Sequence, residues 1–453
     1  MSQTAIAFDN SDSCTLHPSV RTFRIVTLGC KANQYDSERI RESLLGSGLV
    51  EAADAPPDLV IVNTCTVTHQ ADAEGRQLVR RFARRYPGCQ IIVTGCYAAR
   101  DPETLRGLPN VVAVAPHTED LFRVLVRYGV RQPAARITRF SGHQRAFVRI
   151  QDGCLLRCTF CIIPRVRPAL RSRPPEEIED EVKALIDSGY QEIVLTGIHL
   201  GHYGLDWPYR ERVRLWQLIE RLCRIPGRWR LRVSSLEAVE VGEDLLRVFR
   251  DNERICPHLH LCLQSGSDRI LARMNRRYRV SSFLRRVERV RALLDRPALT
   301  TDVIVGFPGE TEEDFEATMR VCEQVGFSRI HVFPFSPRRG TPAAEMDDQI
   351  PPSVIRQRRA ALGELAHELG RRFRSSLVGA THEVLFERRT AEDARVLRGT
   401  SERYVEVRAR VPEGLADQLI GRLAQVRAIR NEEEWLLGQL SGSSLPRLEL
   451  VNL

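Results

Sequence analysis

No stretch of the chain approaches the roughly 20 consecutive apolar residues that a membrane-spanning helix needs. The first twenty residues carry acidic and polar side chains where a secretory signal has an apolar core. Internal repeats and low-complexity tracts are also absent. These absences argue against a membrane or repeat protein, and they predict a cytoplasmic protein without a membrane partner.

Lysine is nearly absent: Lys31 and Lys183 are the only lysines among 67 basic residues. The remaining basic residues are arginines, and the net charge is +9. Arginine binds phosphates and stacks on bases, so this charge is compatible with a polyanionic partner. A preference for arginine codons explains the charge more simply.

The length of 453 residues predicts about three domains. After a predicted flexible tail (residues 1–20), residues 21–130 alternate short β-branched runs with amphipathic stretches. The expected strands are 23–28, 59–63, 91–94 and 111–114, with helices at 37–45, 71–84 and 117–127. This alternation predicts an α/β domain with an open parallel sheet.

A second alternating series predicts a domain over residues 140–372. Its six expected strands are 146–150, 192–196, 230–234, 258–263, 299–305 and 329–333. Six strand–helix units favour a partial barrel that is open on one side. A long helix is expected around residues 362–377, and the short alternating runs of residues 375–445 predict a small antiparallel β-barrel.

Three cysteines follow the first expected barrel strand within eight residues, at Cys154, Cys158 and Cys161. Three thiolates at this spacing suit three irons of a 4Fe-4S cluster and leave the fourth iron open. The alternatives are a zinc site or unliganded thiols. The loop itself offers no fourth ligand for a closed zinc site.

A second trio, Cys30, Cys65 and Cys96, is dispersed along the sequence. Each of these cysteines directly follows a different expected strand of the first domain. The carboxyl ends of parallel strands share one edge of a sheet, so the three thiols should converge there as a second three-cysteine cluster site. Packing as small apolar side chains is the alternative. The other six cysteines are expected to be structural, and His258, His260, Cys262 and Gln264 should line the barrel interior.

Together these motifs resemble the radical S-adenosylmethionine methylthiotransferase family. The resemblance covers nearly the whole chain, and its motifs lie at residues 28–34, 63–65, 95–96, 152–154, 161–164, 264–268 and 302–311. Residues 28–31 and 196–204 are most similar to the MtaB branch, in which His199 and Leu200 stand where other branches carry different residues. The central domain then corresponds to a radical SAM barrel, and the C-terminal barrel resembles the RNA-binding TRAM module.

The resemblance implies two 4Fe-4S clusters, held by the two cysteine trios, and S-adenosylmethionine as both radical source and methyl donor. A radical suits carbon 2 of a purine, because its C–H bond resists acid–base chemistry. The implied S-adenosylmethionine contacts lie at the ends of expected barrel strands, at Thr196, Gly197, Ser235, Glu237, Gln264, Val305 and Gly306. Residues 306–311 are alternatively a simple turn, with Glu310 in the first turn of the next helix.

For this branch the implied substrate is N6-threonylcarbamoyladenosine at position 37 of tRNA, bound through the anticodon loop. Arginines at 356–359, 371–372 and 388–389 are candidate phosphate contacts. The other implied partners are an electron donor such as flavodoxin or ferredoxin and a sulfur source. Alternatives are methylthiolation of isopentenyladenosine or of a ribosomal-protein aspartate, and an iron–sulfur RNA-binding protein without turnover.

Overall fold

The computed structural model describes residues 20–412 and 414–441, so most of the predicted tail, and Cys14, lie outside the described residues. The chain divides into two compact units, one ending at Ile137 and one beginning at Thr138. The predicted division into three domains stays a prediction.

The first unit contains a five-stranded parallel sheet with the strand order β2-β1-β3-β4-β5. All four expected strands are present, and β2 is an additional edge strand. The strands are β1 (Thr22–Thr27), β2 (Val50–Glu51), β3 (Leu59–Thr64), β4 (Gln90–Gly95) and β5 (Val111–Ala115). Central strand β3 is buried at every position, as expected for a strand covered on both faces.

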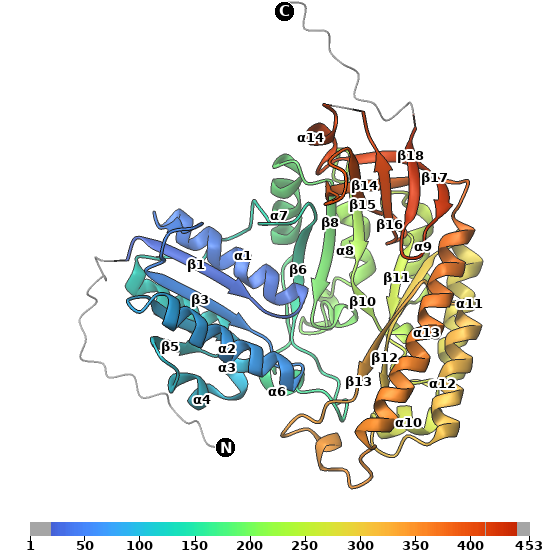
Figure 1. Ribbon diagram of the computed structural model, residues 1–453, viewed down its shortest axis with the longest axis horizontal. Helices are drawn as coiled ribbons and strands as arrows, with labels where there is room; N and C mark the ends of the chain where they lie inside the picture. The colour runs from blue at the N-terminus through green and yellow to red at the C-terminus, as the bar shows by residue number, and fades with distance from the viewer. Residues whose placement is uncertain (1–19, 413, 442–453) are drawn as a thin grey trace, which may run out of the picture. The chain divides into compact units, whose positions relative to one another are not determined.

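Helices connect these parallel strands (Figure 1). They are α1 (Lys31–Gly46), α2 (His69–Arg85), α3 (Cys96–Arg100), α4 (Pro102–Arg106) and α5 (Thr118–Leu125), followed by the short helix η1 (Val126–Tyr128). Helix α2 begins where the hydroxyl of Thr68 accepts a hydrogen bond from the Ala71 amide. The parallel α/β architecture predicted for this region is confirmed.

The second unit begins with the strands of the barrel-like domain, and all six expected strands are found. They are β6 (Ala146–Asp152), β8 (Glu192–Gly197), β9 (Arg230–Val233), β11 (His258–Leu261), β12 (Ala298–Val305) and β13 (Arg329–Pro334), with two-residue strands β7 (Arg171–Ser172) and β10 (Ser235–Leu236). Two four-stranded sheets result, β7-β6-β8-β9 and β10-β11-β12-β13. A parallel bridge joins Leu231 of β9 to Ile255, which lies in the segment before β11.

Helices lie between the successive parallel strands of this domain along the chain (Figure 1). The main ones are α7 (Pro175–Asp187), α8 (Leu215–Cys223), α9 (Glu243–Asp251), α10 (Asp268–Arg273), α11 (Val280–Leu293), α12 (Glu312–Val325) and α13 (Pro352–Ser376). Short helices are α6 (Ile163–Val166), η2 (Leu200–His202), η3 (Tyr209–Glu211), η4 (Ala238–Glu240) and η5 (Pro342–Glu345). Helix α13 is the expected long helix and contacts β13. No helix in the described part of the chain is long and apolar enough to span a bilayer.

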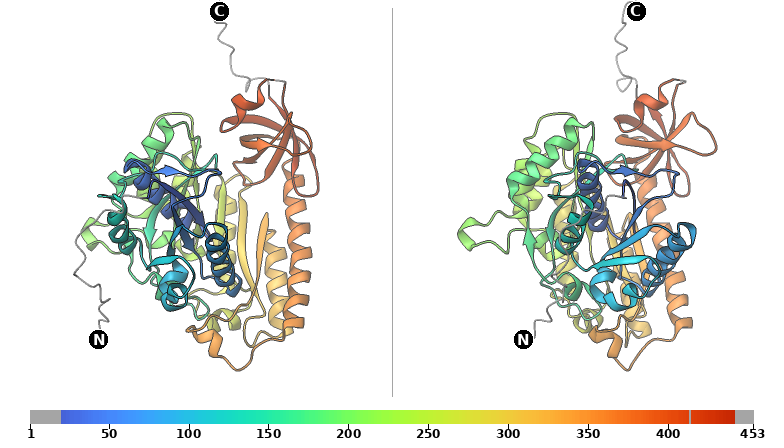
Figure 2. Two further views of the ribbon diagram at one scale, coloured as in Figure 1. Left: turned by 60° about the vertical axis from the view of Figure 1, so that its left-hand side comes forward. Right: turned by 90° about the vertical axis from the view of Figure 1, so that its left-hand side faces the viewer.

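The C-terminal region forms a closed five-stranded barrel with the order β14-β15-β16-β18-β17 (Figure 2). Its elements are β14 (Thr381–Arg389), β15 (Val396–Ser401), β16 (Glu406–Arg410), α14 (Ala416–Leu419), β17 (Leu423–Asn431) and β18 (Leu436–Leu440). The predicted barrel is confirmed. Its strand pairs are antiparallel except β16 and β18, which run parallel.

Candidate active site

The first unit places Cys30, Cys65 and Cys96 at the carboxyl ends of three neighbouring strands. Cys30 caps the N-terminus of α1, Cys65 follows β3, and Cys96 begins α3. Cys30 is exposed, whereas Cys65 and Cys96 are buried. The three thiols therefore converge at one sheet edge, as the sequence predicts.

Two glycines and one asparagine shape this edge. A Cβ atom on Gly29 would lie 2.9 Å from the Cys65 sulfur, and one on Gly95 would lie 2.4 Å from the Thr64 carbonyl oxygen. The Asn33 amide donates to the carbonyls of Leu28 and Thr64, both at 2.9 Å. The loops that carry the cysteines are thus fixed to each other. Sequence reasoning quoted Asn33 as part of a motif but missed this bridging role.

The thiols of this trio influence one another electrostatically. Burial, together with a smaller contribution from the neighbouring Cys96 and Cys30 sulfurs, raises the pKa of Cys65 to about 11. All eleven described cysteines are free thiols. Three grouped sulfurs that would repel one another as thiolates, and that have not formed a disulfide, are a donor set that fits an iron–sulfur cluster.

The second trio lies on the loop after β6. Gly153 begins this loop with a φ angle of +77°, and a Cβ atom there would lie 2.1 Å from the Ala169 carbonyl oxygen, so glycine is required. The Cys161 amide donates to the Cys158 carbonyl oxygen at 3.1 Å and closes a tight turn. Burial raises the pKa of Cys161 to about 12, and the Cys158 and Cys154 sulfurs add to this rise. This trio also fits a cluster.

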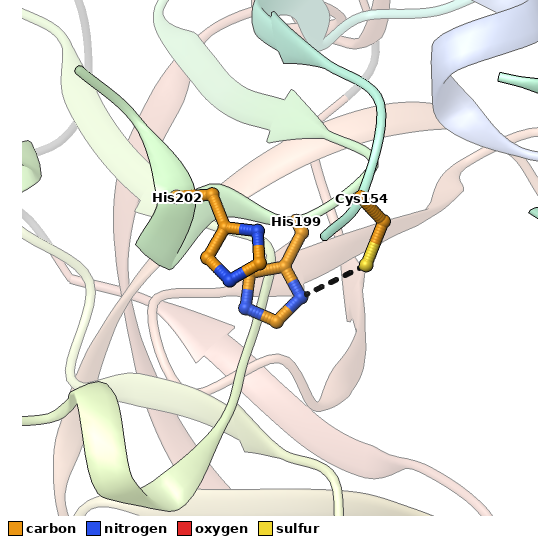
Figure 3. Close-up of side chains that lie close together, drawn as sticks. All are labelled: Cys154, His199 and His202. Atoms are coloured by element: carbon orange, nitrogen blue, oxygen red, sulfur yellow. Dashed lines mark hydrogen bonds between the residues drawn. The ribbon is translucent and has the colours of Figure 1, made fainter. Parts of the chain in front are cut away.

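Figure 3 shows that Cys154 faces two stacked histidines that follow β8. The Cys154 sulfur lies 3.6 Å from Nδ1 of His199, and the His199 and His202 ring centroids are 3.8 Å apart. Nε2 of His199 is bonded to the Glu240 carboxylate. Burial opposes a charge on His199, but Cys154 and Glu240 outweigh it and raise the pKa of His199 to about 10. The sequence analysis used His199 only to separate branches, and it missed Glu240.

A second charged chain reaches Cys158. Arg276 donates to the Cys158 sulfur at 3.2 Å and also binds the Glu237 carboxylate. A pocket of about 180 Å³ adjoins these groups, and its lining includes Cys158, Glu237, Glu240 and Arg276. The sequence analysis did not identify Arg276, whose role is visible only after α10 is packed against the cluster loop.

The predicted S-adenosylmethionine contacts lie at or just after the carboxyl ends of barrel strands. These residues are Thr196 and Gly197 on β8, Ser235 on β10, Glu237, Gln264 after β11, Val305 on β12 and Gly306. Their cofactor contacts stay predictions. Glu310 lies before α12, not in its first turn, so the simple turn alternative is wrong in that detail. It binds the Gly306 amide at 2.7 Å and Arg358 at 2.8 Å.

Comparisons with known proteins agree with this geometry. The Radical SAM superfamily profile matches residues 148–322, and that of the Uncharacterized protein family UPF0004 matches residues 22–115. A radical S-adenosylmethionine methyltransferase, TsrM from Kitasatospora setae, solved with cobalamin and a 4Fe-4S cluster, aligns with a TM-score of 0.54 and 15% identity. The alignment covers 72% of this chain and 77% of that one, and it shows the fold alone.

Curated relatives match over most of the chain. The threonylcarbamoyladenosine tRNA methylthiotransferase MtaB of Chlamydia pneumoniae is 42% identical over 92% of this chain and 98% of its own length. The protein of that name from Thermotoga maritima is 36% identical over 85% of this chain and 91% of its own. A tRNA-2-methylthio-N(6)-dimethylallyladenosine synthase of Corynebacterium urealyticum is 37% identical over 84% of this chain and 75% of its own.

The barrel strands and the cysteine loop after β6 define a radical S-adenosylmethionine enzyme. With relatives of this identity and coverage, the chain belongs to the radical SAM methylthiotransferase family.

Proposed function

We propose that this enzyme transfers a methylthio group to carbon 2 of N6-threonylcarbamoyladenosine at position 37 of tRNA. The observation that carries the proposal is the high coverage of the MtaB relatives, 92% of this chain and 98% of the Chlamydia pneumoniae protein. Synthases named for dimethylallyladenosine match as well, at 37% identity and below. Dimethylallyladenosine, which is the isopentenyladenosine considered above, is therefore the second candidate substrate.

In this proposal Cys154, Cys158 and Cys161 hold one 4Fe-4S cluster, and Cys30, Cys65 and Cys96 hold the second. Bound S-adenosylmethionine supplies a carbon-centred radical and a methyl group. His199 and Arg276 each place a hydrogen-bond donor against a ligand sulfur. Glu237 lines the adjacent pocket, where it would help to orient the cofactor.

The C-terminal barrel is proposed to bind the RNA backbone, as a TRAM-like module, with the anticodon loop as partner. Arg388 and Arg389 are exposed on β14, and Arg356 and Arg359 are exposed on α13. Arg358 is an exception among the predicted phosphate contacts, because it is 5% exposed and bonded to Glu310. That part of the RNA prediction is wrong.

The proposal is tested with the cluster-loaded enzyme under anaerobic conditions, with reductant, S-adenosylmethionine and anticodon stem-loop RNAs. The RNAs differ only at position 37, which is N6-threonylcarbamoyladenosine, isopentenyladenosine or adenosine. Mass spectrometry of the digested RNA should show a methylthio adduct on the first. An adduct confined to isopentenyladenosine would replace the proposed substrate. Formation of deoxyadenosine without any adduct would reject the proposed transfer for these RNAs.

A further inference from the structure

Three polar side chains from adjacent strands meet on one face of the β11–β13 sheet. They are His260 on β11, Asp302 on β12 and His331 on β13, and their ligand atoms all lie within 4.8 Å of one another. Nε2 of His260 is 3.4 Å from the Asp302 carboxylate. Asp302 and His331 are direct partners in the strand register. We call these three residues the His–Asp–His group.

The opposite face of these strands is apolar. Leu259 and Leu261 alternate with His258 and His260 and are at most 1% exposed. The His–Asp–His group therefore lies on the face of the strands that the sequence predicts to line the barrel interior. Nδ1 of His260 is held by the Thr300 hydroxyl at 3.0 Å, so its ring is fixed in orientation.

An exposed aromatic ring lies beside this group. Phe333 is two residues after His331 on β13, so its side chain is on the same face. Its ring centroid is 6.5 Å from that of His331, and the residue is 44% exposed. An exposed phenyl ring next to hydrogen-bonding groups is the arrangement that binds an unstacked base, with stacking on the ring and polar contacts at the base edge.

Phe333 and the His–Asp–His group lie at different depths below the carboxyl ends of the strands. Their spacing suits a purine that reacts at one end and is bound at the other. Phe333 pairs with Ile304, one residue below the end of β12, and His331 pairs with Asp302, two residues deeper. At about 3.3 Å per residue, Phe333 lies just below the strand edge and the His–Asp–His group about 7 Å deeper. The cysteine loop follows the carboxyl end of parallel strand β6, at that same edge. A base stacked on Phe333 would therefore present one end to the cluster loop and the other to the His–Asp–His group.

We propose that Phe333 stacks on the target adenine and that His260, Asp302 and His331 bind the polar group attached to its N6 atom. This inference rests on the proposed function. The threonylcarbamoyl group carries N–H and O–H donors, a carbonyl and a carboxylate. Carboxylate oxygens such as those of Asp302 accept hydrogen bonds, and imidazoles donate or accept them. An isopentenyl group can pair with none of these groups, so their desolvation would go uncompensated.

The test compares dissociation constants of cluster-loaded enzyme for the same stem-loop RNAs, with N6-threonylcarbamoyladenosine or adenosine at position 37. Phe333→Ala should raise the dissociation constants of both RNAs by about tenfold, because both adenine rings would stack on Phe333 in the same way. Asp302→Asn and His331→Gln should reduce the preference for the threonylcarbamoyl RNA by about tenfold and leave adenosine binding nearly unchanged. Val112→Ala, which shortens an exposed side chain on β5, serves as the control.

Iron content and melting temperature are measured for every variant. If Phe333→Ala loses iron, Phe333→Leu, which keeps the bulk and removes the aromatic face, gives the decisive comparison. An unchanged preference in both polar variants, or a stoichiometric metal that His331→Gln releases, would overturn the assignment of the His–Asp–His group. Wild-type turnover tests the proposed function separately: without an adduct on the threonylcarbamoyl RNA the substrate is wrong, whereas turnover with an unchanged variant preference rejects only this inference.

Discussion

Glu192 accepts a hydrogen bond at 2.8 Å from Nε of Arg232, and both side chains are almost completely buried. Arg230 binds the same carboxylate. The two guanidinium groups also donate to backbone carbonyls of the C-terminal barrel, including Thr400 at 2.7 Å and Ser401 at 2.9 Å. One carboxylate on β8 therefore pairs with both arginines that join the C-terminal barrel to the radical SAM domain.

Replacing Glu192 with glutamine should destabilise the second unit strongly. The substitution leaves two buried guanidinium charges without their anion, and breaking a buried ion pair in this way typically costs about 3–5 kcal/mol. Calorimetric or fluorescence melting of the second unit measures the loss. Glu316→Gln, which removes an exposed partner of Arg320, should leave the melting temperature unchanged. Equal melting temperatures for the two variants would contradict the anchoring role.

The same carboxylate predicts acid sensitivity. Burial alone would raise the pKa of Glu192, but Arg230 and Arg232 outweigh it and hold that pKa far below its usual range. Because the folded pKa is depressed, this stabilisation is fully present above the unfolded value of about 4.3 and is lost as the pH falls below it. The melting temperature of the wild type should therefore fall as the pH is lowered below about 4.5. The melting temperature of Glu192→Gln should depend less steeply on pH. Parallel curves for the variant and the wild type would show that Glu192 is not the cause of the acid sensitivity.

Much of the fold followed from the sequence because local patterns determine it. Strand β3 is a continuous apolar run, and the cysteines that follow β1, β3 and β4 had to share one edge once the sheet was parallel. The expected strands match the observed ones to within a few residues. The expected polar face of β11 is also seen, with His258 stacked on Tyr404 and His260 beside Asp302.

The contacts that sequence reasoning missed join residues far apart in the chain. Arg232 reaches the carbonyl of Ser401, 169 residues later, and Arg276 reaches the Cys158 sulfur across 118 residues. No local periodicity marks such pairs. The parallel pairing of β16 with β18 also depends on how the barrel closes, which alternation of polar and apolar residues does not specify.

The two cysteine trios should lose iron independently. Cys30→Ala and Cys154→Ala should each retain about half of the wild-type iron, because each removes one ligand from a separate group. Iron analysis and Mössbauer spectroscopy of anaerobically reconstituted protein measure this. Cys89→Ala, a buried thiol outside both trios, is the matched control and should keep all of it. Complete iron loss in either single variant would show that the two groups are not independent.

Gly95→Ala should reduce iron at the first trio without changing any ligand. Gly95 has a φ angle of +91°, and its added Cβ would lie 2.4 Å from both the Asn63 side-chain oxygen and the Thr64 carbonyl oxygen. The strand end would have to move, and Cys96 with it. Gly363→Ala on α13 has open space around it and should stabilise the helix by up to about 1 kcal/mol with full iron content. Wild-type iron in Gly95→Ala would show that the edge tolerates this displacement.

His199→Gln should lower the reduction potential of the cluster held by the Cys154 trio. Nδ1 of His199 lies 3.6 Å from the Cys154 sulfur, and Glu240 fixes the ring from the other side. Hydrogen bonds to ligand sulfurs stabilise the more negative, reduced state, so their removal makes reduction harder. Redox titration followed by electron paramagnetic resonance measures the midpoint potential without requiring turnover. Glu240→Gln should shift it in the same direction by a smaller amount, since the ring remains but loses its charged partner. His367→Gln on the exposed side of α13 should not shift it, and an unshifted potential in His199→Gln would reduce this histidine to a packing role.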